Sequence, residues 1–178
     1  GGTQLSGLAR WNGSSWEDVG GGVYGAVYAL LSTPAGLVVG GDFQDTAGAS
    51  FVNSVARWDG SSWSGFGWGF YGTPVRGLER HAGQLAAVGD FPGHVAIFDG
   101  SDWNLVGGGL PEGANPTAPQ VIKSLDGLLY VGGEFDVTVD GTRLLNLAAW
   151  DGTAWQGLNG GVDGAVHALA EWDGKLAI

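Results

Sequence analysis

The chain contains no cysteine and no methionine, and basic residues are scarce. Without cysteine, disulfides and thiolate metal sites are excluded, and the redox compartment stays open. Only 7 Lys and Arg residues stand against 18 Asp and Glu, which gives a formal net charge of −11. This balance opposes binding to nucleic-acid phosphates and to anionic membranes. We therefore expect a protein or a glycan as partner, and neither nucleic acid nor membrane.

Long apolar runs are also missing. No stretch approaches the roughly 20 residues that a membrane span needs, and no basic segment followed by an apolar one opens the sequence as a signal peptide would. The start at Gly1-Gly2 without methionine indicates a processed form, a cloned fragment or a domain of a longer protein.

Glycine and tryptophan are what the chain has in abundance. It holds 36 glycines and 9 tryptophans, and 44% of its 178 residues are hydrophobic. That hydrophobic content argues against disorder, and the length suffices for one domain with its own core. Abundant glycine with regularly spaced aromatic residues is typical of short strands joined by tight turns.

One motif recurs four times: an aromatic residue, Asn or Asp, Gly, two further residues and Trp. Its copies begin 47, 40 and 52 residues apart. These intervals lie near the period of roughly 40–50 residues expected for propeller blades. The copies are Trp11–Trp16, Trp58–Trp63, Phe98–Trp103 and Trp150–Trp155.

Two apolar segments precede each motif, and the distance between these two segments is constant, so that each repeat provides four strands. Ten residues separate the end of the first segment from the glycine motif of the second in three repeats: Leu30 to Gly40, Leu78 to Val88 and Ile122 to Gly132. We expect repeats at about 27–66, 75–106, 119–158, and 166–178 joined with 1–19, all within a single domain of residues 1–178.

The fourth repeat is split between the two ends of the chain. Ten places beyond Leu169, counted from Ile178 on to Gly1, the sequence again reaches a Gly-Gly pair. We predict an all-β propeller of four four-stranded blades, the last closed by strands from both termini, which hides the sheet edges. A fragment of a larger array, or two chains forming one eight-unit ring, are the alternatives, so the chain is a monomer or a homodimer.

Turn residues support these strands. The Asn-Gly or Asp-Gly pair within each aromatic motif predicts a two-residue hairpin turn, and Asp126-Gly127 and Asp173-Gly174 predict the same between strands one and two. The Gly-Gly pairs indicate a close approach of two backbones. We expect the first aromatic residue of the motif to pack over that pair.

The hydrophobic strand ending in Gly-Gly, followed by two spaced aromatic residues, resembles kelch-type propeller repeats. It is still more similar to the Gly- and Trp-rich repeat propellers of bacterial secreted proteins. The kelch spacing of aromatics is not reproduced, and the second repeat has Val88-Gly89 in place of Gly-Gly. The resemblance implies a propeller and an extracellular or periplasmic location, but no single activity.

Four polar residues fall in one column of the first strand, which lines the channel of a propeller. A ring of different polar side chains is typical of a small-ligand site, although the same residues can simply hydrate the channel. They are Tyr28, Arg76, Gln120 and His167. A second column, after the glycines, is acidic and either caps turns or binds cations: Asp42, Asp90 and Glu134, with Thr3 in the fourth repeat.

Asp136, Thr138 and Asp140 alternate before Gly141 and resemble the first half of a calcium loop. The Glu that should close such a loop is replaced by Leu147, so a hairpin turn at Asp140-Gly141 is favoured over calcium. We predict no other cofactor.

The segment between Gly65 and Pro74 holds four aromatic residues within six positions. Such a loop favours contact with a sugar or a protein, or else fills the space between blades. The aromatic residues are Phe66, Trp68, Phe70 and Tyr71. No nucleophile elbow, P-loop, dinucleotide fingerprint or metal-spaced histidine pair is present. We predict a non-catalytic binding scaffold; a carbohydrate-active enzyme with channel carboxylates and a structural assembly module are the alternatives.

Overall fold

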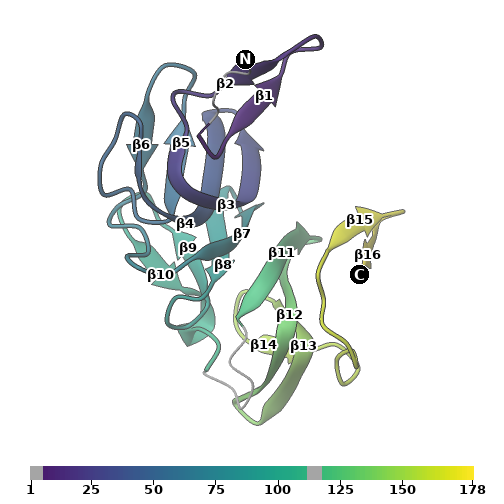
Figure 1. Ribbon diagram of the computed structural model, residues 1–178. Helices are drawn as coiled ribbons and strands as arrows, with labels where there is room; N and C mark the ends of the chain where they lie inside the picture. Colours follow the sequence, from purple (N-terminus) through teal and green to yellow (C-terminus); the bar gives the residue numbers. More distant parts are fainter. Residues whose placement is uncertain (1–5, 112–117) are drawn as a thin grey trace. The chain divides into compact units, whose positions relative to one another are not determined.

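The computed structural model describes residues 6–111 and 118–178 (Figure 1). These residues form an all-β structure of antiparallel strands with one short 3-10 turn, η1 (Val106–Gly108). None of them belongs to a helix with the length and apolar character that crossing a bilayer requires.

The chain divides into two compact units, residues 1–75 with 100–102 and residues 76–99 with 103–178. The first unit contains a two-stranded hairpin, β1–β2, and a four-stranded sheet in the order β3-β4-β5-β6. Its strands are β1 (Ala9–Trp11), β2 (Trp16–Asp18), β3 (Val23–Thr33), β4 (Gly36–Thr46), β5 (Val55–Trp58) and β6 (Trp63–Gly65).

The second unit contains two four-stranded sheets, ordered β10-β9-β8-β7 and β11-β12-β13-β14, and the hairpin β15–β16. Its strands in the first sheet are β7 (Val75–His81), β8 (Gln84–Gly89), β9 (Val95–Phe98) and β10 (Trp103–Leu105). The remaining strands are β11 (Pro119–Leu125), β12 (Leu128–Val139), β13 (Thr142–Trp150), β14 (Trp155–Gly157), β15 (Ala170–Trp172) and β16 (Lys175–Ala177).

The predicted strand order is confirmed in three repeats, each of which forms a sheet of four consecutive antiparallel strands. This arrangement is consistent with a propeller-like fold. The strands of the fourth repeat form two two-stranded sheets, β15–β16 and β1–β2, and the described residues contain no closed sheet.

The turns of the aromatic motif differ from the prediction. Trp11 pairs with Trp16, so four residues rather than two connect the strands. The reason is that the Asn12 side-chain oxygen accepts hydrogen bonds from the backbone N–H groups of Ser14 and Ser15, both at 2.9 Å. This bonding replaces the backbone turn that the Asn-Gly pair suggested.

The corresponding loops between Trp58 and Trp63 and between Trp150 and Trp155 also contain four residues, closed by Asp59 and Asp151. The two-residue turns between strands one and two are confirmed. At Asp126–Gly127 both residues have positive φ, 50° and 80°, as a type I′ turn requires.

The Gly-Gly pairs lie opposite β-bulges. Gly40–Gly41 of β4 faces the point in β3 where Tyr28 has no partner in the register. A Cβ on the second glycine would come closer than 3.0 Å to the backbone at Ala26. The sheet β11–β12 repeats this feature, with Gln120 skipped opposite Gly132–Gly133. The predicted close approach of two backbones is therefore confirmed.

The aromatic ring that we expected over this pair lies elsewhere. Trp58 packs on Gly20, in the loop after β2, where a Cβ would meet the ring within 3.0 Å. The neighbouring Trp63 donates its indole N–H to the Gly20 carbonyl oxygen at 2.8 Å. Equivalent contacts in the second unit involve Trp150, Gly107, Trp155 and Val106. The tryptophan pair thus fastens one repeat to the loop of the repeat before it.

One backbone hydrogen bond recurs in all four repeats. In each one, a carbonyl oxygen accepts from the N–H group that opens the segment leaving the fourth strand. The acceptor lies just upstream of the third strand in three repeats and within it, at Leu145 of β13, in the other. The pairs, donor first, are Val23 and Ser6 (3.1 Å), Phe70 and Asn53 (2.7 Å), Leu110 and Gly93 (2.8 Å), and Val162 and Leu145 (3.2 Å). We call this bond the repeat latch.

Two unusual backbone features make the repeat latch possible. The residue after each acceptor has a positive φ; these residues are Gly7, Ser54, His94 and Asn146. The residue before each donor is a glycine on which a Cβ would collide with the acceptor's strand; these are Gly22, Gly69, Gly109 and Gly161. Each of these glycines follows the second tryptophan of its motif by six residues.

We expect Gly161→Ala to destabilise the protein far more than Gly160→Ala. Both glycines have nearly the same φ, 86° and 89°, so the conformational cost of about 1 kcal/mol is shared. Only at Gly161 does the new Cβ collide with the Leu145 backbone, whereas Gly160 faces open space. The collision should raise the loss to about 3 kcal/mol. Urea denaturation of the two variants measures the difference, and equal losses would show that the latch is unimportant.

Candidate functional site

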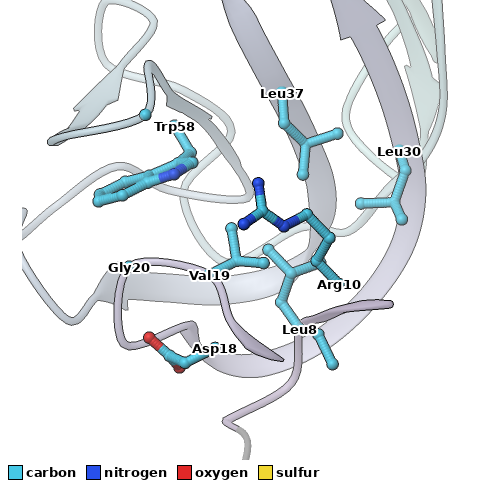
Figure 2. Close-up of a pocket in the computed structure, with 10 residues that line it drawn as sticks. Leu8, Arg10, Asp18, Val19, Gly20, Leu30, Leu37 and Trp58 are labelled. Atoms are coloured by element: carbon cyan, nitrogen blue, oxygen red, sulfur yellow. The ribbon is translucent and has the colours of Figure 1, made fainter. Parts of the chain in front are cut away.

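A pocket of about 500 Å³ lies in the first unit, beside the hairpin β1–β2 and the sheet β3–β6 (Figure 2). Most of its wall is apolar, with one basic and one acidic side chain. Its lining residues are Leu8, Ala9, Arg10, Asp18, Val19, Gly20, Leu30, Leu37, Trp58 and Gly60.

Arg10 provides the pocket's positive charge. Figure 2 shows its guanidinium among Leu37, Leu30 and Trp58. The same guanidinium forms an ion pair with Glu17 at 2.6 Å; the Arg10 side chain is largely exposed and that of Glu17 partly so. Hydrogen bonds from Asn12 and then Arg10 lower the pKa of the Glu17 carboxyl. An exposed pair of this kind contributes little free energy, and it leaves the guanidinium within reach of the pocket.

The same place in the second unit is filled by a strand. By repeat alignment, Leu30 and Leu37 correspond to Ile122 and Leu129. The latter two are 8% and 0% exposed, because they belong to one core cluster with Ala86 and other residues of β8. Leu30 is 56% exposed. In the second unit, residues equivalent to two of the pocket's walls are thus packed in a core with β8, whereas in the first unit Leu30 faces the pocket.

Three of the predicted channel residues lie in the first strands of their repeats, Tyr28 in β3, Arg76 in β7 and Gln120 in β11, whereas His167 precedes β15 and lies outside any strand. Tyr28 lies in β3 of the first unit and is 46% exposed, while the other three belong to the second unit. Arg76 donates to both carboxylate oxygens of Asp90, at 3.3 and 2.7 Å. Gln120 is the half-buried bulge residue of β11, and His167 is exposed. Their convergence around one axis stays a prediction.

In the acidic column, Asp90 forms an ion pair with Arg76. Asp42 and Glu134 are exposed on β4 and β12, and Thr3 lies outside the described residues. Within residues 6–111 and 118–178, no group of three or more histidine or acidic side chains could hold a metal ion.

The weak calcium candidate forms part of a hairpin. Asp140–Gly141 is a two-residue turn with φ of 48° and 80°, as the alternative interpretation predicted. Asp136 accepts two hydrogen bonds from Arg143, at 2.8 and 2.7 Å, and these lower the pKa of its carboxyl. Thr138 lies between the two acids and is exposed. The Asp136 carboxylate is thus already paired with Arg143, and calcium binding here stays a prediction.

The aromatic loop divides into buried and exposed rings. Phe70 is 9% exposed, whereas Trp68 and Tyr71 are 83% and 72% exposed. Phe66 is half-buried and lies under the Arg57 guanidinium, 6.0 Å from its centroid. The loop thus has a buried anchor and two rings directed to solvent.

The backbone of this loop is held by the preceding segment. Asn53 donates from its side-chain amide to the carbonyl oxygen of Trp68 at 2.8 Å, and its own carbonyl accepts the latch bond from Phe70. The Ser54 hydroxyl reaches the Phe70 carbonyl at 3.2 Å. Trp68 and Tyr71 therefore project from a fixed backbone.

A polar cluster joins β7 and β11 in the second unit, and sequence reasoning missed it. Lys123 and Glu79 form an ion pair at 3.2 Å, and the His81 Nδ1 atom lies 2.9 Å from the Ser124 hydroxyl. Glu79 and Lys123 occupy the same column of the repeat alignment. Opposite charges at one position of consecutive repeats were the signal that could have revealed the contact.

No family model matches this sequence, and a comparison with curated proteins finds no match.

We expect His81 to make the protein less stable in mild acid. Burial lowers the pKa of its imidazole, an effect that the charge of Glu79 partly offsets. The unfolded chain therefore binds a proton at a higher pH than the folded one, so stability falls as pH drops below about 6.5. Lys123 also faces Glu79, with which it forms an ion pair.

Urea midpoints at neutral and mildly acidic pH should differ less for His81→Asn than for the parent chain. The exposed His167→Asn is the control. An unchanged pH dependence in His81→Asn would contradict the assignment.

Proposed function

We propose that this chain is a non-catalytic binding module that contacts a glycan or a protein through the loop bearing Trp68 and Tyr71. The observation that carries the proposal is the exposure of two large aromatic rings on a backbone fixed by Asn53 and Phe70. An immobile aromatic residue offers a large contact area and loses little conformational entropy on binding.

The lack of charged side chains in this loop supports a neutral contact surface. Residues 65–75 contain no acidic or basic side chain, although the chain as a whole is strongly acidic. Ring faces without neighbouring charges suit the C–H face of a sugar or an apolar protein side chain. A ligand can contact the exposed rings of Trp68 and Tyr71 without displacing the buried Phe70.

Trp68→Ala and Tyr71→Ala should each weaken ligand binding about tenfold or more, as loss of an aromatic anchor does, and leave the thermal midpoint unchanged. Phe70→Ala should instead lower stability by about 3 kcal/mol, because a buried ring is lost. A glycan array and a set of candidate proteins provide the ligands. Trp172→Ala, another exposed tryptophan, is the matched control. Equal binding by the Trp68→Ala and Trp172→Ala variants would refute the proposal.

We also propose that the fourth repeat closes as a blade, with β16 pairing alongside β1. The support comes from the other repeats, in which the second strand pairs with the third. Leu37 is opposite Trp58 and Val38 opposite Arg57. The same register would place Leu176 opposite Trp11 and Ala177 opposite Arg10. Strand β16 would then occupy the pocket, as β8 occupies the equivalent place in the second unit.

Closure predicts that the double variant Arg10→Cys with Ala177→Cys forms a disulfide under mild oxidation. The chain has no cysteine of its own, so no other disulfide competes. In the control, Arg10→Cys is combined with Glu171→Cys on β15, one strand spacing of about 5 Å farther away. Non-reducing electrophoresis and light scattering report the product against the chain mass of 18.2 kDa.

A cross-linked monomer would support closure within one chain. A cross-linked dimer would instead indicate that a second copy of the chain completes the ring. No cross-link above the control would refute both arrangements and leave the pocket open to a different ligand.

A further inference from the structure

The first aromatic hairpin reverses the polarity of a contact found in other repeats. Asn12 donates from its side-chain amide to the Glu17 carboxylate at 2.6 Å. At the equivalent positions of two other repeats, the carboxylate comes first and the amide second. These pairs are Asp99 with Asn104 (2.8 Å) and Asp151 with Gln156. Each of these three hairpins thus holds one amide and one carboxylate, but only in the first is the amide that of an asparagine followed by a glycine.

We propose that Asn12 is a site of spontaneous deamidation and that the product weakens the hairpin β1–β2. The reaction needs only water. The backbone nitrogen of Gly13 attacks the side-chain carbon Cγ of Asn12, a C–N bond forms, and ammonia leaves with the proton from that nitrogen. Water then opens the cyclic imide at either carbonyl, giving aspartate or isoaspartate. Asparagine is among the thermally labile residues, and glycine after it leaves the attacking nitrogen unshielded.

The hairpin places three donors on the oxygen where negative charge develops. The Asn12 side-chain oxygen accepts from the N–H groups of Ser14 and Ser15, each at 2.9 Å, and from the Ser14 hydroxyl at 3.0 Å. Donors fixed on a developing oxyanion lower the barrier to attack at the carbon beside it. Gly13 has a φ of 103° and no atom within 4 Å of its Cβ position, so the attacking residue has room to turn.

The product is poorly matched to its surroundings. An aspartate at position 12 would set a second carboxylate against Glu17, where the amide now donates at 2.6 Å. Arg10 pairs with Glu17 and can offset only part of this repulsion. Isoaspartate would add a backbone atom between Trp11 and Trp16 and disturb their pairing. Because Arg10 lines the pocket, the change reaches the pocket wall.

The chain contains an internal reference for the rate. Asn159–Gly160 is the same dipeptide, and both of its residues are exposed in the loop after β14. Peptide mass spectrometry of the full chain, aged at neutral pH, should find Asn12 converted about fivefold faster than Asn159, given three oxyanion donors. In urea the two rates should become similar.

Ser14→Ala should slow the reaction at Asn12, because one donor is lost, while Ser61→Ala in another hairpin should not. A slower conversion of Asn12 in the folded chain than in urea would overturn the proposed activation.

The effect of the product is tested separately with Asn12→Asp, which should lower the thermal midpoint. Adding Glu17→Gln should restore it, because the double variant has the same polarity as the Asp151 hairpin. Glu17→Gln alone should not raise the midpoint. An unchanged midpoint in Asn12→Asp would overturn the claim that deamidation weakens the hairpin. Neither experiment depends on ligand binding or on blade closure.

Discussion

The repeat latch is the backbone hydrogen bond on which the other features depend. It joins the segment that leaves the fourth strand to a residue just before or within the third strand, and so holds these two parts of each repeat together. The bond forms only because the residue after the acceptor has a positive φ and because the glycine before the donor lets the two backbones approach each other. Both exceptions are unfavourable for most residues, so their presence at the same place in all four repeats indicates a shared requirement.

The latch also positions the surfaces with which the molecule can act. In the repeat of β3–β6 its donor is Phe70, and the same residue is the buried anchor of the aromatic loop. Trp68 and Tyr71 gain a fixed direction from this bond. The tryptophan pairs depend on it in a similar way, since Gly20 and its equivalent lie in the segment that the latch holds in place. Fold and candidate site therefore share one cause.

The sequence predicted the features that are local and periodic. The strand order, the pairing within each aromatic motif and the close approach at Gly40–Gly41 follow from spacing and from the lack of a Cβ. Contacts across repeats were missed, because Trp63 and Gly20 lie 43 residues apart and no local rule joins them. The four-residue turns were missed because side-chain oxygens compete with the backbone turn. The constant six-residue step from tryptophan to latch glycine was visible in the sequence, and it would have revealed the latch.

How deeply a tryptophan pair is buried depends on the loop of the adjoining repeat and not on the hairpin to which the pair belongs. The ring centroids of Trp11 and Trp16 are 5.5 Å apart at 58°, nearly as in the Trp150 and Trp155 pair at 5.6 Å and 55°. Yet Trp16 is 61% exposed and Trp155 only 4%. Turn chemistry fixes the geometry within a hairpin, since the same side-chain oxygen contacts recur in both. The loop of an adjoining repeat supplies the indole acceptor and the apolar cover, so the difference in exposure measures what packing between repeats adds to a structure already formed locally.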